Sequence, residues 1–168
     1  MKVIKQCVLN GHHFTFALPS LTDKNLLVEG FKKLSLRSKH YRFHTSKPIL
    51  STQELNYFLD VDEYNHYAIG VLEKIKETVH GIAFIRYIRD TTDVASAEVA
   101  LAIVDSHHRI GLGSRLYLEL IQHAKENNIK TFTHYILNEN RAMLNLLKKF
   151  DATFSNGLSG TTKVTVSL

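Results

Sequence analysis

The chain contains one cysteine, two prolines and no tryptophan among its 168 residues. Because Cys7 has no partner within the chain, an internal disulfide is excluded, and nothing marks an oxidising compartment. Two prolines and eight glycines are too few for a collagen-like or linker-like chain. No stretch approaches the roughly 20 apolar residues of a membrane span, and the first residues lack the apolar run of a signal peptide. We therefore expect a cytoplasmic protein.

The chain has 44% hydrophobic and 22% charged residues, a composition typical of a globular domain. A chain of this length buries enough surface for one core, so we expect residues 1–168 to form a single domain that needs no metal for stability. The 21 lysines and arginines exceed the 16 acidic residues, which favours anionic partners. The basic residues are spread along the chain, however, and this distribution argues against a nucleic-acid-binding module without excluding one.

Hydrophobic periodicity predicts the elements of the first half. Strands are predicted at residues 14–18, 67–72, 79–88 and 94–104. Between the first two strands, the spacing of Leu27, Phe31 and Leu34 predicts a helix, and the capping box from Ser51 to Glu54 predicts the start of another. Gly81 and the polar segment 89–93 are expected to separate three consecutive antiparallel strands.

The second half alternates between helices and strands. Residues 114–127 are predicted as a helix with one apolar face, residues 131–137 as a strand, and residues 161–168 as a final strand. A second helix is predicted to begin near Asn138 or Asn140 and to carry Phe150 on its apolar face. This order predicts a mixed α+β domain of the α/β type, in which a central, mixed, mostly antiparallel sheet is flanked by helices on both faces.

The segment 104–114 is the most informative part of the sequence. It leaves an apolar strand, passes a polar loop that contains Gly111 and Gly113, and enters a helix. Backbone N–H groups at a helix start lack partners, the helix dipole favours negative charge, and glycines let a phosphate approach the backbone. The segment therefore predicts an anion site. No lysine follows the glycines as in a P-loop, and the third glycine and acidic residue of a Rossmann fingerprint are missing.

This loop resembles that of the GNAT N-acetyltransferase superfamily, Gln/Arg-x-x-Gly-x-Gly/Ala, with His108 in place of the glutamine or arginine. A second family element also matches, a strand followed by Asn140-Arg141-Ala142-Met143 and an amphipathic helix. Residues 34–43 and 67–71 are similar to the acetyltransferase domain of bacterial protein-lysine acetyltransferases. The resemblance implies a monomeric or homodimeric enzyme that transfers an acetyl group from acetyl-CoA to a primary amine, either a protein lysine or a small amine, with no metal.

The resemblance also implies which residues bind acetyl-CoA. They are Ala102, Ile103, Val104, Arg109, Ile110, Gly111, Leu112, Gly113, Ser114 and Asn140. The first three would act through their backbone groups, on the pantetheine arm and the thioester carbonyl, while Asn140 is also a candidate helix cap. Leu147 stands where many relatives carry a tyrosine that protonates the leaving thiolate, which leaves Tyr135 or water for that role. A catalytically idle acyl-CoA sensor is therefore the alternative function.

Glu98 is the candidate general base. It is the only charged residue between Asp93 and Asp105, and an apolar environment favours the protonated form of an unpaired carboxylate. Such a group is suited to accept a proton near neutral pH. By resemblance, the related protein acetyltransferases carry a glutamate at this place as general base. The alternative is an exposed strand residue or a partner of Arg86 or Arg89.

Ten histidines raise the question of a metal site. His12 and His13 are adjacent, as are His107 and His108, and neighbouring side chains on a strand or loop diverge. No His-Glu-x-x-His motif and no Cys–His spacing of a zinc site is present. We expect solvated loop histidines and no metal ligand, with His107 and His108 adding partial positive charge beside the phosphates.

Overall fold

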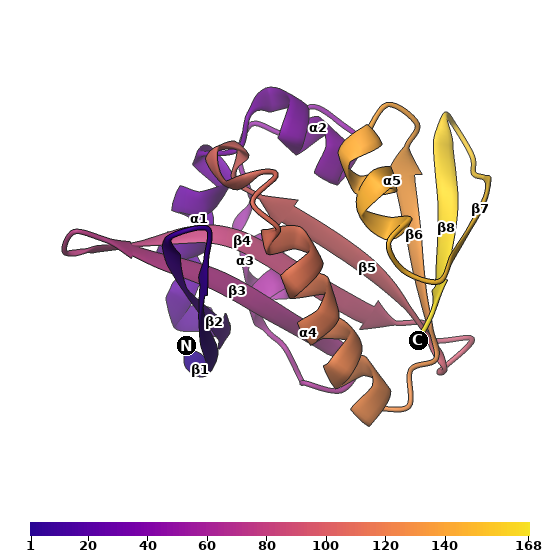
Figure 1. Cartoon of the computed structure of the whole chain (residues 1–168), viewed down its shortest axis with the longest axis horizontal. Coiled ribbons are helices and arrows are strands. Elements are labelled where there is room, and N and C mark those ends of the chain that lie inside the picture. Colours follow the sequence, from indigo (N-terminus) through magenta and orange to yellow (C-terminus); the bar gives the residue numbers. More distant parts are fainter.

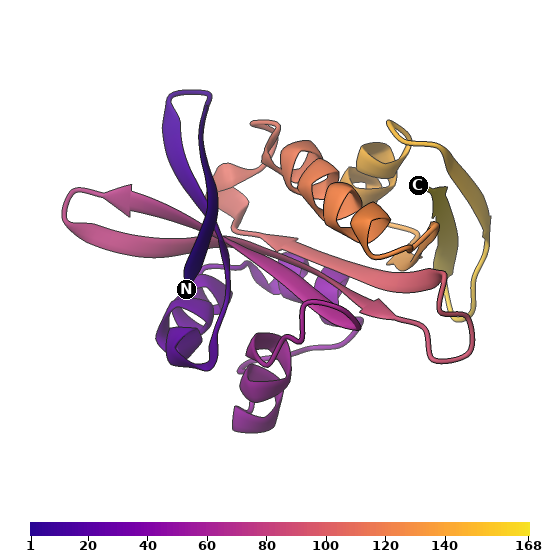
Figure 2. The same cartoon turned by 90° about the horizontal axis from the view of Figure 1, so that it is seen from below.

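The computed structural model describes residues 1–168 and contains one eight-stranded sheet with helices on both faces (Figures 1 and 2). The strands are β1 (Lys2–Leu9), β2 (His12–Leu18), β3 (His66–Ile75), β4 (Thr78–Arg89), β5 (Ser96–Ile103), β6 (Thr131–Leu137), β7 (Ala152–Asn156) and β8 (Thr161–Ser167). The α-helices are α1 (Lys24–Lys32), α2 (Leu36–Phe43), α3 (Thr52–Leu59), α4 (Leu112–Glu126) and α5 (Arg141–Leu147), and two 3₁₀ turns are η1 (Leu21–Asp23) and η2 (Asp105–His107). The strand order is β1-β2-β3-β4-β5-β6-β8-β7, and only the β5–β6 pair is parallel, which confirms the predicted fold class.

Strands β5 and β6 pair along only a short stretch. Residues 96–98 of β5 pair with residues 131–133 of β6, and the two strands then separate (Figure 1). Strand β6 remains paired with β8 along its other edge. Residues 99–103 of β5 therefore keep one edge that no strand covers, and the sheet opens there.

Helix α4 packs on the face of the sheet opposite to α1 and α3 (Figure 2). Its sequence places Leu112, Leu116, Leu120 and Ala124 at helical spacing, and each is at most 1% exposed. Complete burial of a large aliphatic side chain stabilises a fold by roughly 1.5–3 kcal/mol. This apolar face therefore fixes the position of the loop at the start of α4.

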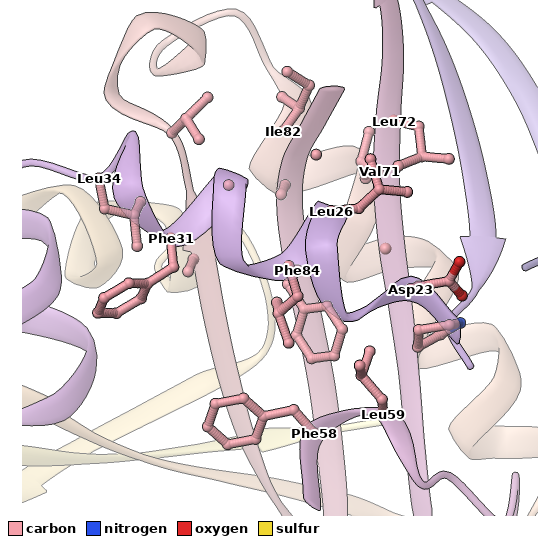
Figure 3. Close-up of a pocket in the computed structure, with 18 of the residues that line it drawn as sticks. Asp23, Leu26, Phe31, Leu34, Phe58, Leu59, Val71, Leu72, Ile82 and Phe84 are labelled. Carbon is pink, nitrogen blue, oxygen red and sulfur yellow. The ribbon is translucent and has the colours of Figure 1, made fainter. Parts of the chain in front are cut away.

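On the opposite face, α1 crosses β4 at a close approach of two glycines. A Cβ atom on Gly81 would lie 2.7 Å from the carbonyl oxygen of Leu26, and one on Gly30 would lie 3.2 Å from that of Gly81. Figure 3 shows apolar side chains around a cavity of about 80 Å³ at this contact. The prediction that Gly81 separates two strands is wrong, because it lies inside β4 beside a bulge, and residues 76–77 form the turn.

Local capping signals are confirmed. The hydroxyl of Ser51 accepts a hydrogen bond from the Glu54 N–H at 3.2 Å, and the Glu54 carboxylate accepts one from the Ser51 N–H at 2.8 Å. Residues 131–137 form a strand with the predicted bounds. The sequence pattern did not predict α2 or β7, and α5 ends before Phe150. Helix α2 has no buried residue, so it lacks the apolar face on which the prediction depends. None of the helices has the length and apolar character needed to cross a membrane.

Candidate active site

A cleft of about 970 Å³ opens where β5 and β6 separate. Eight of the predicted site residues line it: Glu98, Ala102, Ile103, Arg109, Gly111, Gly113, Ser114 and Asn140. The side chains of Val104 and Leu112 are 3% and 1% exposed and belong to the core, against which Ile110 also packs. The cleft thus joins the glycine loop and the Asn140 segment to α2, which lies in the segment 34–43 that carries the family resemblance but was not predicted as a helix.

The uncovered edge of β5 presents backbone groups to the cleft. The N–H of Val104 donates to the carbonyl of Ile82 on β4, and the Val104 carbonyl accepts from the N–H of His107, both at 2.9 Å. Backbone groups alternate in direction along a strand, so Ile103 and Leu101 direct theirs away from β4, toward the cleft. The expectations for the Val104 and Ala102 backbones are therefore corrected, because both polar groups of Val104 are already bonded within the chain and those of Ala102 face β4. Leu101 was not predicted.

The start of α4 forms a cradle of free backbone donors. Gly111 precedes the helix with a φ of +88°, a left-handed conformation that glycine adopts without strain. The N–H of Arg115 makes the first helical hydrogen bond, to the Gly111 carbonyl at 3.2 Å. The N–H groups of Leu112, Gly113 and Ser114 precede that bond and have no partner within the helix. Together with the helix dipole, they can bind an anion.

Cationic side chains surround this cradle. Arg109, Arg141 and Lys149 line the cleft, and the Lys149 amine lies 3.5 Å from the Ser114 hydroxyl. His108 is exposed, and its Nε2 lies 2.8 Å from the Ile103 carbonyl oxygen, so it joins the loop to β5. The electrostatics of this end of the cleft suit a ligand with several phosphates.

Helix α5 presents Asn140 at its first turn. The Asn140 Oδ1 accepts a hydrogen bond from the Met143 N–H at 3.2 Å, which confirms the predicted cap. Its amide Nδ2 is left for a ligand in the cleft. Leu147 is fully buried, whereas Leu146 lines the cleft. A proton donor for a leaving group must therefore come from another residue or from water. Tyr135, the predicted candidate, lines the cleft and is 47% exposed.

Glu98 lies at the point where β5 and β6 separate. It is exposed, which corrects the expectation of an apolar environment, because the separated strands leave it beside the open cleft. Its charge acts on Arg42 of α2 and Arg86 of β4 without a direct ion pair. Arg89 is not its partner, since that guanidinium donates to the Asn127 carbonyl at 2.9 Å.

Arg42 and Arg86 give this end of the cleft positive charge. Both arginines are half-buried; desolvation by the surrounding side chains and the neighbouring Arg86 lower the pKa of Arg42 to about 10, and desolvation also lowers the pKa of Arg86. Both side chains remain charged at neutral pH. The Arg86 guanidinium lies over the rings of Tyr57, at 4.8 Å, and Phe58, at 4.5 Å. Arg42 lies in the segment 34–43 that carries the family resemblance, but its role was not predicted, because no hydrophobic periodicity places its helix beside Glu98.

Helix α2 is joined to the loop before α4 through Asp105. The Asp105 carboxylate accepts hydrogen bonds from the hydroxyls of Ser35, at 2.7 Å, and Ser38, at 2.9 Å, and from the Ser35 N–H at 2.9 Å. Desolvation alone would raise the pKa of Asp105, but these hydrogen bonds outweigh it and lower the pKa. The carboxylate form therefore holds the two sides of the cleft together.

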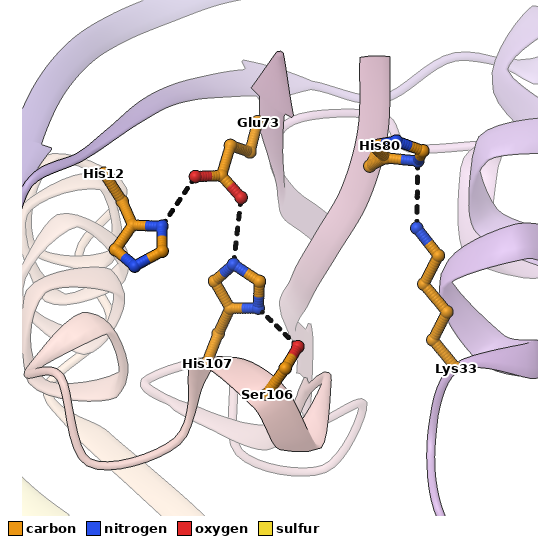
Figure 4. A network of polar contacts seen from close by, with 6 residues as sticks. All are labelled: His12, Lys33, Glu73, His80, Ser106 and His107. Atoms are coloured by element: carbon orange, nitrogen blue, oxygen red, sulfur yellow. Dashed lines mark hydrogen bonds and ion pairs between the residues drawn. The ribbon is translucent and has the colours of Figure 1, made fainter. Parts of the chain in front are cut away.

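Two of the histidines expected in solvated loops are instead bonded to one carboxylate. His107 is 7% exposed and its Nε2 lies 2.9 Å from Oε2 of Glu73, while Nδ1 of His12 lies 2.6 Å from Oε1 (Figure 4). Desolvation alone would raise the pKa of Glu73, but the two imidazoles outweigh it and lower the pKa. The expectation fails for His12 and His107 because their partner is far away in the sequence. His13 and His108 are exposed.

Comparisons with known proteins agree with this geometry. The family model described as Acetyltransferase (GNAT) family matches residues 36–152. The chain is 29% identical over 133 residues to Acetyltransferase Pat of Mycolicibacterium smegmatis, which covers 79% of this chain and 39% of that protein. The chain thus spans about two fifths of the length of this curated relative.

Solved structures show the same fold. The GNAT domain of S. lividans PAT superposes with a TM-score of 0.87 at 25% identity, over 98% of this chain and 96% of that one. The structure of yncA from Salmonella typhimurium with its cofactor acetyl-CoA gives a TM-score of 0.71 at 13% identity, over 92% of each chain. With a family match over more than half of its length and a sheet that opens at the predicted phosphate loop, the chain belongs to the acetyltransferase (GNAT) family.

Proposed function

We propose that the protein transfers an acetyl group from acetyl-CoA to a primary amine, on a protein lysine or a small molecule, with Glu98 as general base. The observation that carries this proposal is the uncovered stretch of β5, which has Glu98 at one end and the glycine loop beyond the other. Five residues of strand at about 3.3 Å each separate Glu98 from Ile103 by about 17 Å. This span leaves room for an extended cofactor arm along the strand.

The residues around the cleft fit the parts of acetyl-CoA. The cradle N–H groups and the nearby cations suit its phosphates, and the β5 edge suits the amides of its pantetheine arm. Its thioester supplies the activated acetyl group. The residues to which we assign binding are Leu101, Ile103, Arg109, Gly111, Leu112, Gly113, Ser114, Asn140, Arg141 and Lys149.

The chemistry assigned to this chain is proton transfer and charge stabilisation. The amine nitrogen attacks the thioester carbonyl carbon, and Glu98 accepts a proton from that nitrogen, directly or through one water. The N–H of Leu101, about 10 Å along the strand from Glu98, donates to the carbonyl oxygen as negative charge develops there. The C–N bond forms, the C–S bond breaks, and coenzyme A leaves as a thiolate. An unperturbed thiol has a pKa of about 8.5, so water or Tyr135 is sufficient to protonate the thiolate.

The charge around Glu98 restricts the acceptor. Arg42 and Arg86 place two positive charges beside the carboxylate, so an acceptor with several ammonium groups is repelled. A lysine flanked by acidic side chains brings one amine to Glu98 and presents its carboxylates to the arginines. We therefore infer that such a lysine is a better acceptor than a polyamine.

Release of coenzyme A, measured with a lysine peptide flanked by aspartates and with spermidine, tests the function. We expect turnover with the acidic peptide, an acetyl-lysine product by mass spectrometry, and slower turnover with spermidine. Acetyl-CoA binding without turnover for any amine would instead identify an idle acyl-CoA sensor. Absence of acetyl-CoA binding, together with DNA binding that weakens steeply with salt, would identify a nucleic-acid-binding module.

A further inference from the structure

A cluster of potential metal ligands lies next to the glycine loop and has no part in the proposed transfer. It consists of His12 on β2, Glu73 on β3 and His107 in η2 (Figure 4). The donor atoms, one from each residue, all lie within 4.8 Å of one another. The Glu73 and His107 side chains are 8% and 9% exposed, whereas the His12 side chain is 40% exposed. The cluster is therefore buried on two sides and reachable from solvent on the third.

We propose that His12, Glu73 and His107 form a binding site for a single zinc ion. Two imidazoles and one carboxylate are a ligand set that zinc uses in proteins, with a water in the fourth position. Tetrahedral ligands about 2.1 Å from zinc lie about 3.4 Å from one another. The His12 and His107 nitrogens lie 2.6 Å and 2.9 Å from the two Glu73 oxygens, and the three donor atoms lie within 4.8 Å of one another, so changes of up to about 1.4 Å in their separations create that geometry.

The surroundings of the cluster orient both imidazoles toward the carboxylate. Nδ1 of His107 lies 2.8 Å from the Ser106 hydroxyl, so it can donate its proton there while Nε2 offers its lone pair to a metal. The ring of Phe14 stacks on His12 at 5.7 Å and meets His107 edge-on at 5.9 Å. Packing against this ring limits the rotation of both ligands. A hydrogen-bonded second partner for one imidazole and packed ligands are features of a preorganised metal site.

Without a metal, the same contacts require each imidazole to present an N–H to Glu73. Zinc replaces those two protons and connects β2, β3 and η2 through one ion. His107 precedes the glycine loop by four positions, and its N–H bonds the Val104 carbonyl at the end of β5. Zinc therefore holds the start of the loop in place. It is expected to raise the stability of the protein and to take no part in the acetyl transfer itself.

Metal binding to the full chain, purified without a polyhistidine tag, tests the proposal directly. After treatment with a chelator and dialysis, titration with Zn²⁺ by calorimetry is expected to give one site per chain and a higher melting temperature. Co²⁺ is expected to give the intense visible absorption of a four-coordinate site. A wild-type protein that binds neither ion would overturn the proposal, and the cluster would then be a hydrogen-bonded network alone.

Variants locate the ion among ten histidines. Glu73→Gln and His107→Gln keep the side-chain size and are expected to abolish the Co²⁺ spectrum, and Ser106→Ala is expected to weaken Zn²⁺ binding by about 10–100-fold. His13→Ala is the matched control, since His13 is exposed on the same strand as His12. Equal Zn²⁺ affinity and an unchanged spectrum in wild type and Glu73→Gln would show surface binding elsewhere and overturn the site, whether or not the His107 variant folds.

Discussion

The two ends of the cleft differ in the kind of group that they offer. The loop end offers backbone N–H groups from adjacent residues at the start of α4, supported by a buried helix face. The Glu98 end offers side chains from separate elements, with Arg42 on α2 and Tyr135 on β6, while the charge of Arg86 on β4 acts on Glu98 from outside the lining. Recognition by backbone tolerates a change of side chain, such as His108 at the start of the loop, but not a bulky side chain in the cradle. Recognition by side chains depends on single charges.

The largest effect is expected from Glu98→Gln. This variant keeps the shape of the side chain but cannot accept a proton, so kcat should fall by about 10²–10⁴-fold while the Kd for acetyl-CoA stays nearly unchanged. The loss should shrink at high pH, where more of the amine is already deprotonated. Steady-state kinetics over a pH series, with calorimetric binding of acetyl-CoA, measure both quantities.

Glu139→Gln is the matched control, because Glu139 also lines the cleft but lies beside α5. Its kcat should remain within a few fold of wild type. Wild-type kcat and an unchanged pH profile in Glu98→Gln would show that Glu98 is structural, and the Glu98 end would then act by shape alone.

The loop end is tested by Gly113→Val. A Cβ on Gly113 would lie 3.4 Å from the side chains of Ile103 and Leu146, and both of these residues line the cleft. A valine should therefore enter the cleft and weaken acetyl-CoA binding by about 10–100-fold, the equivalent of one hydrogen bond to a charged group. Gly113→Ala should have a smaller effect. Unchanged binding of acetyl-CoA by the valine variant would remove the glycine loop from the cofactor site.

The contribution of buried His134, which lies beside the cleft, is tested through the pH dependence of stability. His134 on β6 is 1% exposed, its Nε2 lies 2.7 Å from the Tyr117 hydroxyl, and burial lowers its pKa to about 3. The unfolded chain takes up this proton near pH 6.5, so the stability from neutral His134 is present above pH 6.5 and is lost as the pH falls toward 3. Between pH 7 and pH 5, the free energy of unfolding should fall by about 2 kcal/mol from this group. Urea unfolding of His134→Gln should show a correspondingly weaker pH dependence, and an equal slope in both proteins would contradict the assignment.

The smallest effect is expected from Asn140→Ala, which separates a cap from a ligand. Loss of the bond to the Met143 N–H should lower the free energy of unfolding by about 1 kcal/mol. Loss of the amide in the cleft should also raise the KM for acetyl-CoA. Ser51→Ala removes a cap of α3, remote from the cleft, and should change stability alone. Equal kinetics in the two variants would leave Asn140 as a cap only.

The difference between features that depend on adjacent residues and features that depend on separate elements also explains which parts of the molecule could be predicted from sequence. Capping at Ser51, the strand at 131–137 and the glycine loop depend on neighbouring residues, and the structure has each of them in place. Helix α2 is mostly polar and only its last residue, Phe43, packs against the core, so no periodicity identified it. The exposure of Glu98 depends on where two strands separate, and no local pattern encodes that point. For the same reason, the contacts of Glu73 with His12 and His107, 61 and 34 residues away, could not be predicted.

The carboxylate of Asp105 has a consequence for how binding at one end of the cleft affects the other end. It lies in η2, just before the glycine loop, and accepts hydrogen bonds from Ser35 and Ser38 at the start of α2. The Asp105 carboxylate is thus a hydrogen-bonded connection between the loop at the phosphate end of the cleft and the helix that carries Arg42 at the Glu98 end. If a ligand at the loop changes the affinity for a ligand at the Glu98 end, linkage requires the second ligand to change the affinity for the first by the same factor. Coupling through this three-residue turn would therefore be reciprocal and would set no order of binding.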